Sequence, residues 1–311
     1  MSWFNFIVIV LGLAMFETIA SIDNAVINAE VLSTMQPKAR KWFLLWGLLI
    51  AVFLVRGLLP WMIVWGVNPT LGPIGALTAT FSNNPHVRES VDAAAPILLA
   101  GGGTFLLFLF FHWLFLEDKH FGLPRFKKFF AKNGIWFYAV VSVILSVIVW
   151  YTLKQNPMMA FGAVLGSTAF FITHGFKQNA EEKEKSLTDK HLSDISKLMY
   201  LEIIDATFSI DGVLGAFAFT LSVPLILLGN GLGAFIVREI TISNVERIKK
   251  YVFLKNGAMY SILFLGTFML LKAFGVEVPE WASSFATFAA VGYFFLKSHR
   301  LLKAQVPTSV H

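Results

Sequence analysis

Nine stretches of about 20 mostly apolar residues follow one another along this chain of 311 residues. An α-helix of that length can cross the hydrocarbon core of a bilayer once. Only 14% of the residues are charged, against about 25% in soluble domains, which excludes a soluble globule, a disordered chain and a nucleic-acid-binding protein. The sequence therefore predicts an all-α integral membrane protein with about nine transmembrane helices, in which residues 1–311 form one polytopic domain. The predicted spans are 4–33, 42–66, 95–116, 134–153, 158–176, 197–221, 224–243, 252–274 and 280–299.

The loops between these spans differ in charge. Clusters of lysine and arginine follow the first, third, fifth, seventh and ninth spans, whereas the other loops contain only Arg88, Lys154 and Lys272. In membrane proteins the cytoplasmic loops carry the excess of Lys and Arg. The alternation predicts an N-terminus outside and a C-terminus inside, in a multi-pass protein of the inner (plasma) membrane.

A short motif occurs twice in the chain. Glu17–Ala25 in the first span matches Asp205–Val213 in the sixth, because both have an acidic residue, three further residues and then Ser-Ile-Asp. A second match, Phe53–Arg56 with Phe235–Arg238, follows in the second and seventh spans. Five spans separate the copies, so they cross the membrane in opposite directions, as do the inverted repeats of secondary transporters. The alternative is a shared helix-packing motif without a transport role. The repeat divides the chain into a first half of five helices (1–176), a cytoplasmic hinge loop (177–197) and a second half of four helices (198–311).

Five carboxylates lie within the two helices that carry the first motif. They are Glu17 and Asp23 in the first span, and Glu202, Asp205 and Asp211 in the sixth. An acidic residue near the centre of a spanning helix costs at least about 2.5–3.5 kcal/mol, so this number of acids favours function over structure. Because the helices run in opposite directions, we expect Glu17 and Asp211 to form an outer layer, and Asp23 and Asp205 an inner one.

Each repeat also supplies one arginine, Arg56 in the second span and Arg238 in the seventh. Their positions suggest that each compensates the charge of one carboxylate layer, or gates it.

The acids within one repeat are six residues apart, which rotates them by about 240° on a straight helix. Either the helix unwinds near Ser-Ile-Asp, or the two acids face different neighbours. Gly212 favours unwinding in the second copy, since glycine tolerates irregular backbone.

The candidate ligands are almost all oxygen atoms. Besides the carboxylates they comprise Asn24, with Asn28, Ser21, Ser209 and the imidazole of His174 as accessory groups. Oxygen ligands favour hard divalent cations, so Mn²⁺, Ca²⁺ or Mg²⁺ rank above copper or zinc. Histidines 112 and 174 could bind metal or relay protons, although packing at helix ends is the simpler interpretation. The chain has no cysteine, which excludes thiolate metal sites.

The element Glu17–Ala25 resembles the E-x5-D-N-A element of the TerC-type integral membrane family, and Glu202–Asp211 resembles the second acidic element of that family. The family is named for tellurium resistance and belongs with the LysE-like exporters. The resemblance implies export of a divalent metal, most often manganese. It also implies that Glu17, Asp23, Asn24, Asp205 and Asp211 are site residues. Gly212 stands where the first copy has Asn24, so the two half-sites differ chemically.

We therefore expect a secondary transporter that exports a divalent cation, Mn²⁺ in preference to Ca²⁺ or Mg²⁺, with proton exchange as an open option. No nucleotide-binding motif occurs, so an ATP-driven pump is not expected. An enzyme activity, a permanently bound cofactor and a nucleic-acid partner are not expected either. The expected partners are the metal ion, protons and the lipid bilayer, and the oligomeric state stays open. Two alternatives are an intramembrane aspartyl hydrolase, whose chemistry needs paired aspartates, and a membrane scaffold in metal or tellurite stress response.

Overall fold

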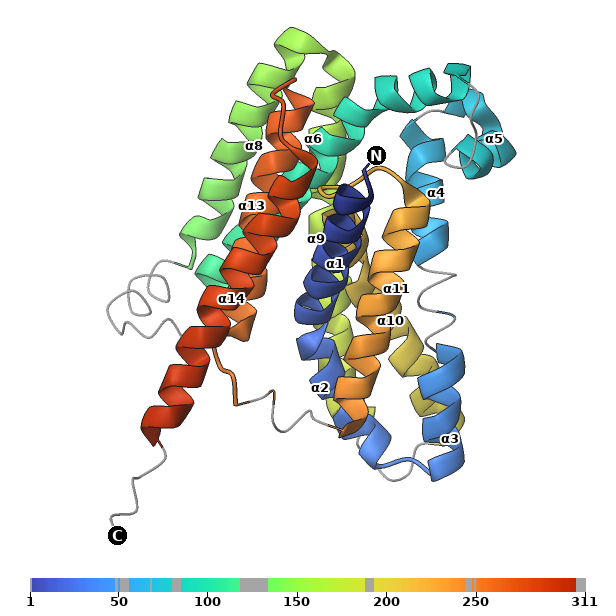
Figure 1. Cartoon of the computed structure of the whole chain (residues 1–311), viewed down its shortest axis with the longest axis vertical. Helices are drawn as coiled ribbons and strands as arrows, with labels where there is room; N and C mark the ends of the chain where they lie inside the picture. The colour runs from blue at the N-terminus through green and yellow to red at the C-terminus, as the bar shows by residue number, and fades with distance from the viewer. Residues whose placement is uncertain are drawn as a thin grey trace.

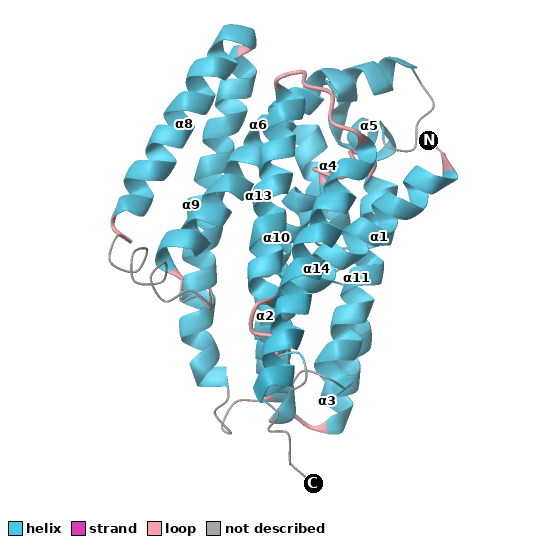
Figure 2. Cartoon of the chain, turned by 60° about the vertical axis from the view of Figure 1, so that its left-hand side comes forward, coloured by secondary structure: helices cyan, strands magenta, loops and turns pink. Residues whose placement is uncertain are grey.

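The computed structural model describes residues 2–47, 50, 56–67, 69–79, 85–117, 134–187, 193–243, 248 and 250–305. The side chains of some helical residues, among them Asp23, Asn24 and Arg56, lie outside the described part. Within the described part every regular element is a helix (Figures 1 and 2). Among the described residues, six helices are long and apolar enough to cross a membrane, over Trp3–Ala20, Ala94–Leu116, Trp136–Gln155, Pro157–Asn179, Val223–Ile240 and Leu254–Ala273. The chain is an all-helical, multi-pass membrane protein.

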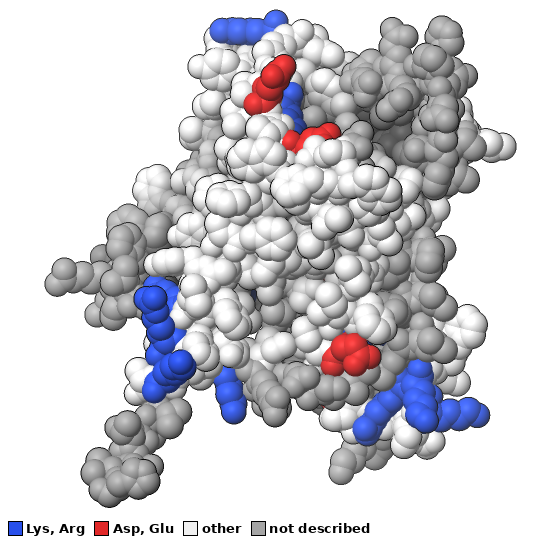
Figure 3. All heavy atoms as spheres, viewed as in Figure 1, with Lys and Arg blue, Asp and Glu red and all other residues white. Residues whose placement is uncertain are grey.

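The first half of the chain contains α1 (Trp3–Ala20), α2 (Ile22–Ser33), α3 (Pro37–Trp42), the π-helical turn η1 (Phe43–Gly47), α4 (Arg56–Val67), the 3₁₀ turn η3 (Pro69–Leu71), α5 (Gly72–Ala79), α6 (Pro85–Leu116), α8 (Trp136–Gln155) and α9 (Pro157–Leu187). The second half contains α10 (Asp194–Ala216), α11 (Val223–Ser243), α13 (Leu254–Ala273) and α14 (Glu280–Gln305). In Figure 1, α1 begins in the upper half of the molecule and α14 ends at the lower end. Lys and Arg side chains gather at that lower end over α3 and the last turns of α14, and an uncharged band covers the middle of the visible face (Figure 3).

The two helices that carry the acidic motif differ in continuity. The first is interrupted at Ser21, where α1 ends and α2 begins. Helix α10, in contrast, continues without a break through Gly212 to Ala216, so of the two alternatives the second holds in this copy, and its acids face different neighbours. The glycine instead leaves space for a neighbouring side chain, as described below.

The segment predicted as a hinge loop, residues 177–197, is mostly helical. Helix α9 extends to Leu187 and α10 begins at Asp194.

The helices pack into two connected groups. Helix α6 packs against α9 and α13, and α8 covers α9. Helix α1 packs between α11 and α14, while α10 contacts both groups. Large aromatic side chains fill the interior of the first group, namely Phe105, Phe108, Trp113, Phe137 and Phe170. This packing leaves α10 at the junction, with one face toward α9 and another toward α1, α2 and α11.

Helices α1 and α11 approach each other closely at two glycines. A methyl group added at Gly229 would lie 2.5 Å from the Leu13 Cβ atom. One added at Gly233 would lie 2.6 Å from the Glu17 Cβ atom and 2.7 Å from the carbonyl oxygen of Ala14. These distances are too short for any side chain, so the small-xxx-small spacing sets the separation of the two helices.

We expect Gly233→Ala to lower the stability of the purified protein by about 1–3 kcal/mol, because the added methyl group meets backbone of α1 as well as side chain. The measurement is thermal unfolding in detergent. Gly175→Ala in α9 is the matched control, since a methyl group there meets no described atom within 4 Å. Equal melting temperatures for the two variants would contradict the close α1–α11 contact.

Candidate functional site

Glu17 lies in the last turn of α1 and is only 1% exposed. The Ser21 hydroxyl donates a hydrogen bond to Glu17 Oε1 over 2.7 Å. The carboxylate also lies directly against α10, because a methyl group added at Gly212 would be 2.7 Å from Glu17 Oε2. Together with Gly233 of α11, Gly212 forms a close-fitting pocket around this side chain. The difference between Asn24 and Gly212 in the two repeats thus has a steric reason, since an amide at position 212 would displace the Glu17 carboxylate.

A second acidic group lies along one face of α10. Glu202, Asp205 and Ser209 recur at i, i+3 and i+7, which places them on the same side of a helix. The Ser209 hydroxyl donates to the carbonyl oxygen of Asp205 over 2.7 Å, and the carboxylate of Glu202 packs against Gly47 in η1. Asp205 is 8% exposed, so this acidic face is turned into the bundle.

Arg238 of α11 is the basic partner of this face. Its Nη2 atom lies 3.6 Å from Asp205 Oδ2, and its Nη1 donates to the carbonyl oxygen of Phe43 over 2.6 Å. The guanidinium carbon also lies 4.3 Å from the centroid of the Phe43 ring. Arg238 therefore connects α10 to η1 through an ion pair, a hydrogen bond and a cation–π contact.

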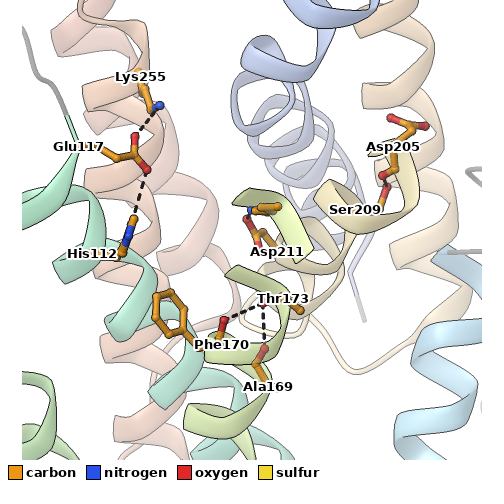
Figure 4. Close-up of polar contacts among 10 residues, drawn as sticks. His112, Glu117, Ala169, Phe170, Thr173, Asp205, Ser209, Asp211 and Lys255 are labelled. Atoms are coloured by element: carbon orange, nitrogen blue, oxygen red, sulfur yellow. Dashed lines mark hydrogen bonds and ion pairs between the residues drawn. The ribbon is translucent and has the colours of Figure 1, made fainter. Parts of the chain in front are cut away.

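Asp211 faces the other way. It lies six residues after Asp205 on a continuous helix, a rotation of about 240°, and Figure 4 shows the two side chains pointing in different directions. Its carboxylate forms an ion pair with Lys177 of α9, and each side chain is 14% exposed. Sequence reasoning placed Lys177 in a cytoplasmic loop and did not identify this pair. The signal was available, because the predicted fifth span continues to Phe176, and a lysine directly after a span can extend along the helix.

A separate polar cluster joins α6, α9 and α13, and Figure 4 shows its His112, Glu117 and Lys255 side chains. The Lys255 ammonium lies 2.7 Å from Glu117 Oε2, and His112 Nδ1 lies 3.7 Å from Glu117 Oε1. The rings of His112 and His174 are 3.9 Å apart between centroids. His174 thus belongs to this cluster on α6 and α9, whereas sequence reasoning listed it as an accessory ligand of the acids.

Glu117 is the first residue after α6 and lies outside the apolar span. Burial alone would raise its pKa, but His112 and Lys255 reverse the effect and lower the pKa from 4.5 to about 2. Because the pKa of the folded state is depressed, the ionised carboxylate stabilises the fold above pH 4.5, and this contribution is lost as the pH falls toward 2.

The remaining predicted site residues are distributed around these groups. Asn28 of α2 is buried, and its Oδ1 atom has no hydrogen-bond partner in the described part of the chain. The side chains of Asp23, Asn24 and Arg56 lie outside the described residues, and so does the Asp23 half of the expected Asp23–Asp205 layer. Among the described residues, no three His, Asp or Glu side chains are placed to hold a metal ion together.

A family model described as "Protein of unknown function (DUF475)" matches residues 22–304. The chain belongs to the DUF475 family. The DUF475 match covers the acidic face of α10, Arg238 and the histidine cluster, and Glu17 lies just before its first residue. No curated protein and no solved structure matches the chain.

Proposed function

We propose that this DUF475 protein is a secondary transporter that exports a divalent metal cation, with Mn²⁺ favoured, across the plasma membrane. The observation that carries the proposal is the acidic face of α10, where the buried Asp205 and the partly buried Glu202 lie near one guanidinium, that of Arg238. Among the described side chains, two carboxylates share this one guanidinium inside an apolar bundle. Such charge is costly in a membrane protein unless a cation or proton compensates it, so it usually marks a transport path.

The proposed ligands are Glu17, Glu202 and Asp205, with Asn28, Asp23 and Asn24 as further oxygen donors. Ser21 and Ser209 already donate hydrogen bonds within their own helices and position the acids instead. Asp211 is not among the proposed ligands because its carboxylate already forms an ion pair with Lys177. An all-oxygen set suits Mn²⁺, Ca²⁺ or Mg²⁺, and the resemblance to TerC-type exporters favours Mn²⁺. In this proposal cation binding draws the carboxylates of α1 and α10 together.

An aspartyl hydrolase is less well supported. That chemistry needs two carboxylates that share a proton. Asp205 and Asp211 instead lie on different sides of α10 and contact different basic residues, Arg238 and Lys177.

The nine-span topology and the inverted repeat are part of the proposal. In the inverted repeat, α1 and α2 correspond to α10, and the helix of Arg56 corresponds to α11. Corresponding helices cross the membrane in opposite directions. The basic residues at the lower end of Figure 3 then lie in the cytoplasm, and export proceeds from that end.

The test is cation flux into proteoliposomes that contain the purified protein. We expect Mn²⁺ flux above that of protein-free vesicles, and lower flux for Zn²⁺. Because the chain has no cysteine, a single Lys303→Cys substitution labelled by an impermeant maleimide reports which way each molecule is inserted. The absence of flux for Mn²⁺, Ca²⁺ and Mg²⁺ would overturn the proposal.

A further inference from the structure

The His112–His174 pair is not needed for the proposed cation site, yet its geometry is specific. The two rings lie 3.9 Å apart, and His112 is buried. Aromatic rings surround them, since Phe137 packs edge-on against His112 and Phe170 stacks in parallel on His174. Two imidazoles this close disfavour positive charge on both rings at once.

The pair lies next to two charged groups. On one side His112 Nδ1 faces Glu117, whose other carboxylate oxygen binds Lys255. On the other side, His174 precedes Lys177 by three residues on α9, so the two side chains are neighbours on one helix face. Lys177 in turn binds Asp211 on α10. A row of polar groups therefore leads from the end of α6 to the side of α10 opposite the proposed ligands.

We propose that Glu117, His112 and His174 form a proton path between the end of α6 and the Lys177–Asp211 pair, which couples proton movement to cation transport. This inference rests on the proposed function. It gives α10 two roles, with the cation on the face of Glu202 and Asp205, and protons on the opposite face.

The transfer steps conserve protons. A proton taken up by His174 from water at the Lys177–Asp211 pair passes to a ring nitrogen of His112, as one N–H bond breaks and another forms. His112 then releases a proton at Nδ1 to a carboxylate oxygen of Glu117, from which water at the end of α6 removes it. The Lys177–Asp211 ion pair marks the inner end of the path.

Each element packed around the pair contributes to its charge environment. Helix α9 presents Lys177, α10 presents Asp211 and α13 presents Lys255, while Glu117 follows α6. From α8 the contact is the apolar ring of Phe137. Among the described residues these groups comprise two acids and two bases. Their charges balance, so neither sign is in excess around the pair.

The experiment compares Mn²⁺ flux with and without a pH gradient in proteoliposomes whose membrane potential is clamped. The readout is the ratio of the two fluxes. We expect His112→Gln and His174→Gln to reduce the stimulation by the pH gradient about tenfold or more, because each removes a proton carrier. His299→Gln is the matched control, since His299 of α14 stacks on Tyr251 and Phe295 away from the path, and it should keep the wild-type ratio.

A wild-type ratio in either variant would overturn the proton path while leaving the transporter proposal intact. Absence of wild-type flux for every divalent cation would overturn both. If a glutamine variant does not insert, ¹⁵N imidazole spectra of the wild-type protein in detergent carry the test. Two of its seven histidines should then titrate in coupled steps, and seven independent titrations would overturn the path.

Discussion

Glu17→Gln should abolish divalent cation transport, with a loss of more than about 100-fold in initial Mn²⁺ flux. Substitutions that only reorient metal ligands lower metal affinity or activity about 10–100-fold, and removal of a charged ligand lowers them further. Glutamine has nearly the same shape as glutamate, so it still fits against Gly212 and Gly233 and can still accept the Ser21 hydrogen bond. The lost flux would therefore report the negative charge at this position and not a packing defect.

The control is Glu30→Gln, which removes the same charge from an exposed position on α2. We expect this variant to transport at the wild-type rate. Size-exclusion profiles of both variants show whether each protein is intact. Wild-type flux in Glu17→Gln would contradict a ligand role for Glu17 and would leave Glu202 and Asp205 as the only described carboxylates in the proposed site.

Much of the helical framework could be predicted from local sequence. Hydropathy over about 20 residues identified the positions of α6, α8, α9, α11 and α13, because each needs only its own apolar sequence to be recognised. The acidic residues stood out for the same reason, since a carboxylate within an apolar stretch has few structural explanations.

The partners of those acids could not be predicted in the same way. Lys177 lies 34 residues before Asp211, and its pairing depends on how α9 and α10 pack, which no local pattern describes. The role of Gly212 could not be predicted because its neighbour Glu17 comes from another helix. Glycine can permit unwinding or close approach, and only the tertiary contact decides between them. His112 and His174 are 62 residues apart along the chain, so no local pattern could predict the contact between their rings.

Arg238→Gln should destabilise the protein by about 3–5 kcal/mol, because it removes the charged partner of a buried carboxylate. Asp205 would lose its ion pair, Glu202 would remain beside it, and the carbonyl oxygen of Phe43 would lose its donor. Arg238→Lys should cost less, since the charge is kept. Lysine lacks the planar fork, however, so it cannot reach Asp205, the Phe43 carbonyl and the Phe43 ring together. The measurement is thermal and denaturant unfolding of the purified protein in detergent.

The double variant Asp205→Asn/Arg238→Gln separates the ion pair from the other contacts of the arginine. If the cost of Arg238→Gln comes mainly from an uncompensated carboxylate, removing that charge should recover part of the lost stability, with an interaction free energy of about 1–3 kcal/mol. The cost should also shrink as the pH falls, because protonated acids need no counter-charge, and added Mn²⁺ should stabilise Arg238→Gln more than the wild type. Additive effects in the double variant, together with a cost that does not change with pH or Mn²⁺, would show that Arg238 serves only to hold η1 against α11. The arginine would then have no part in balancing the charge of the proposed cation site.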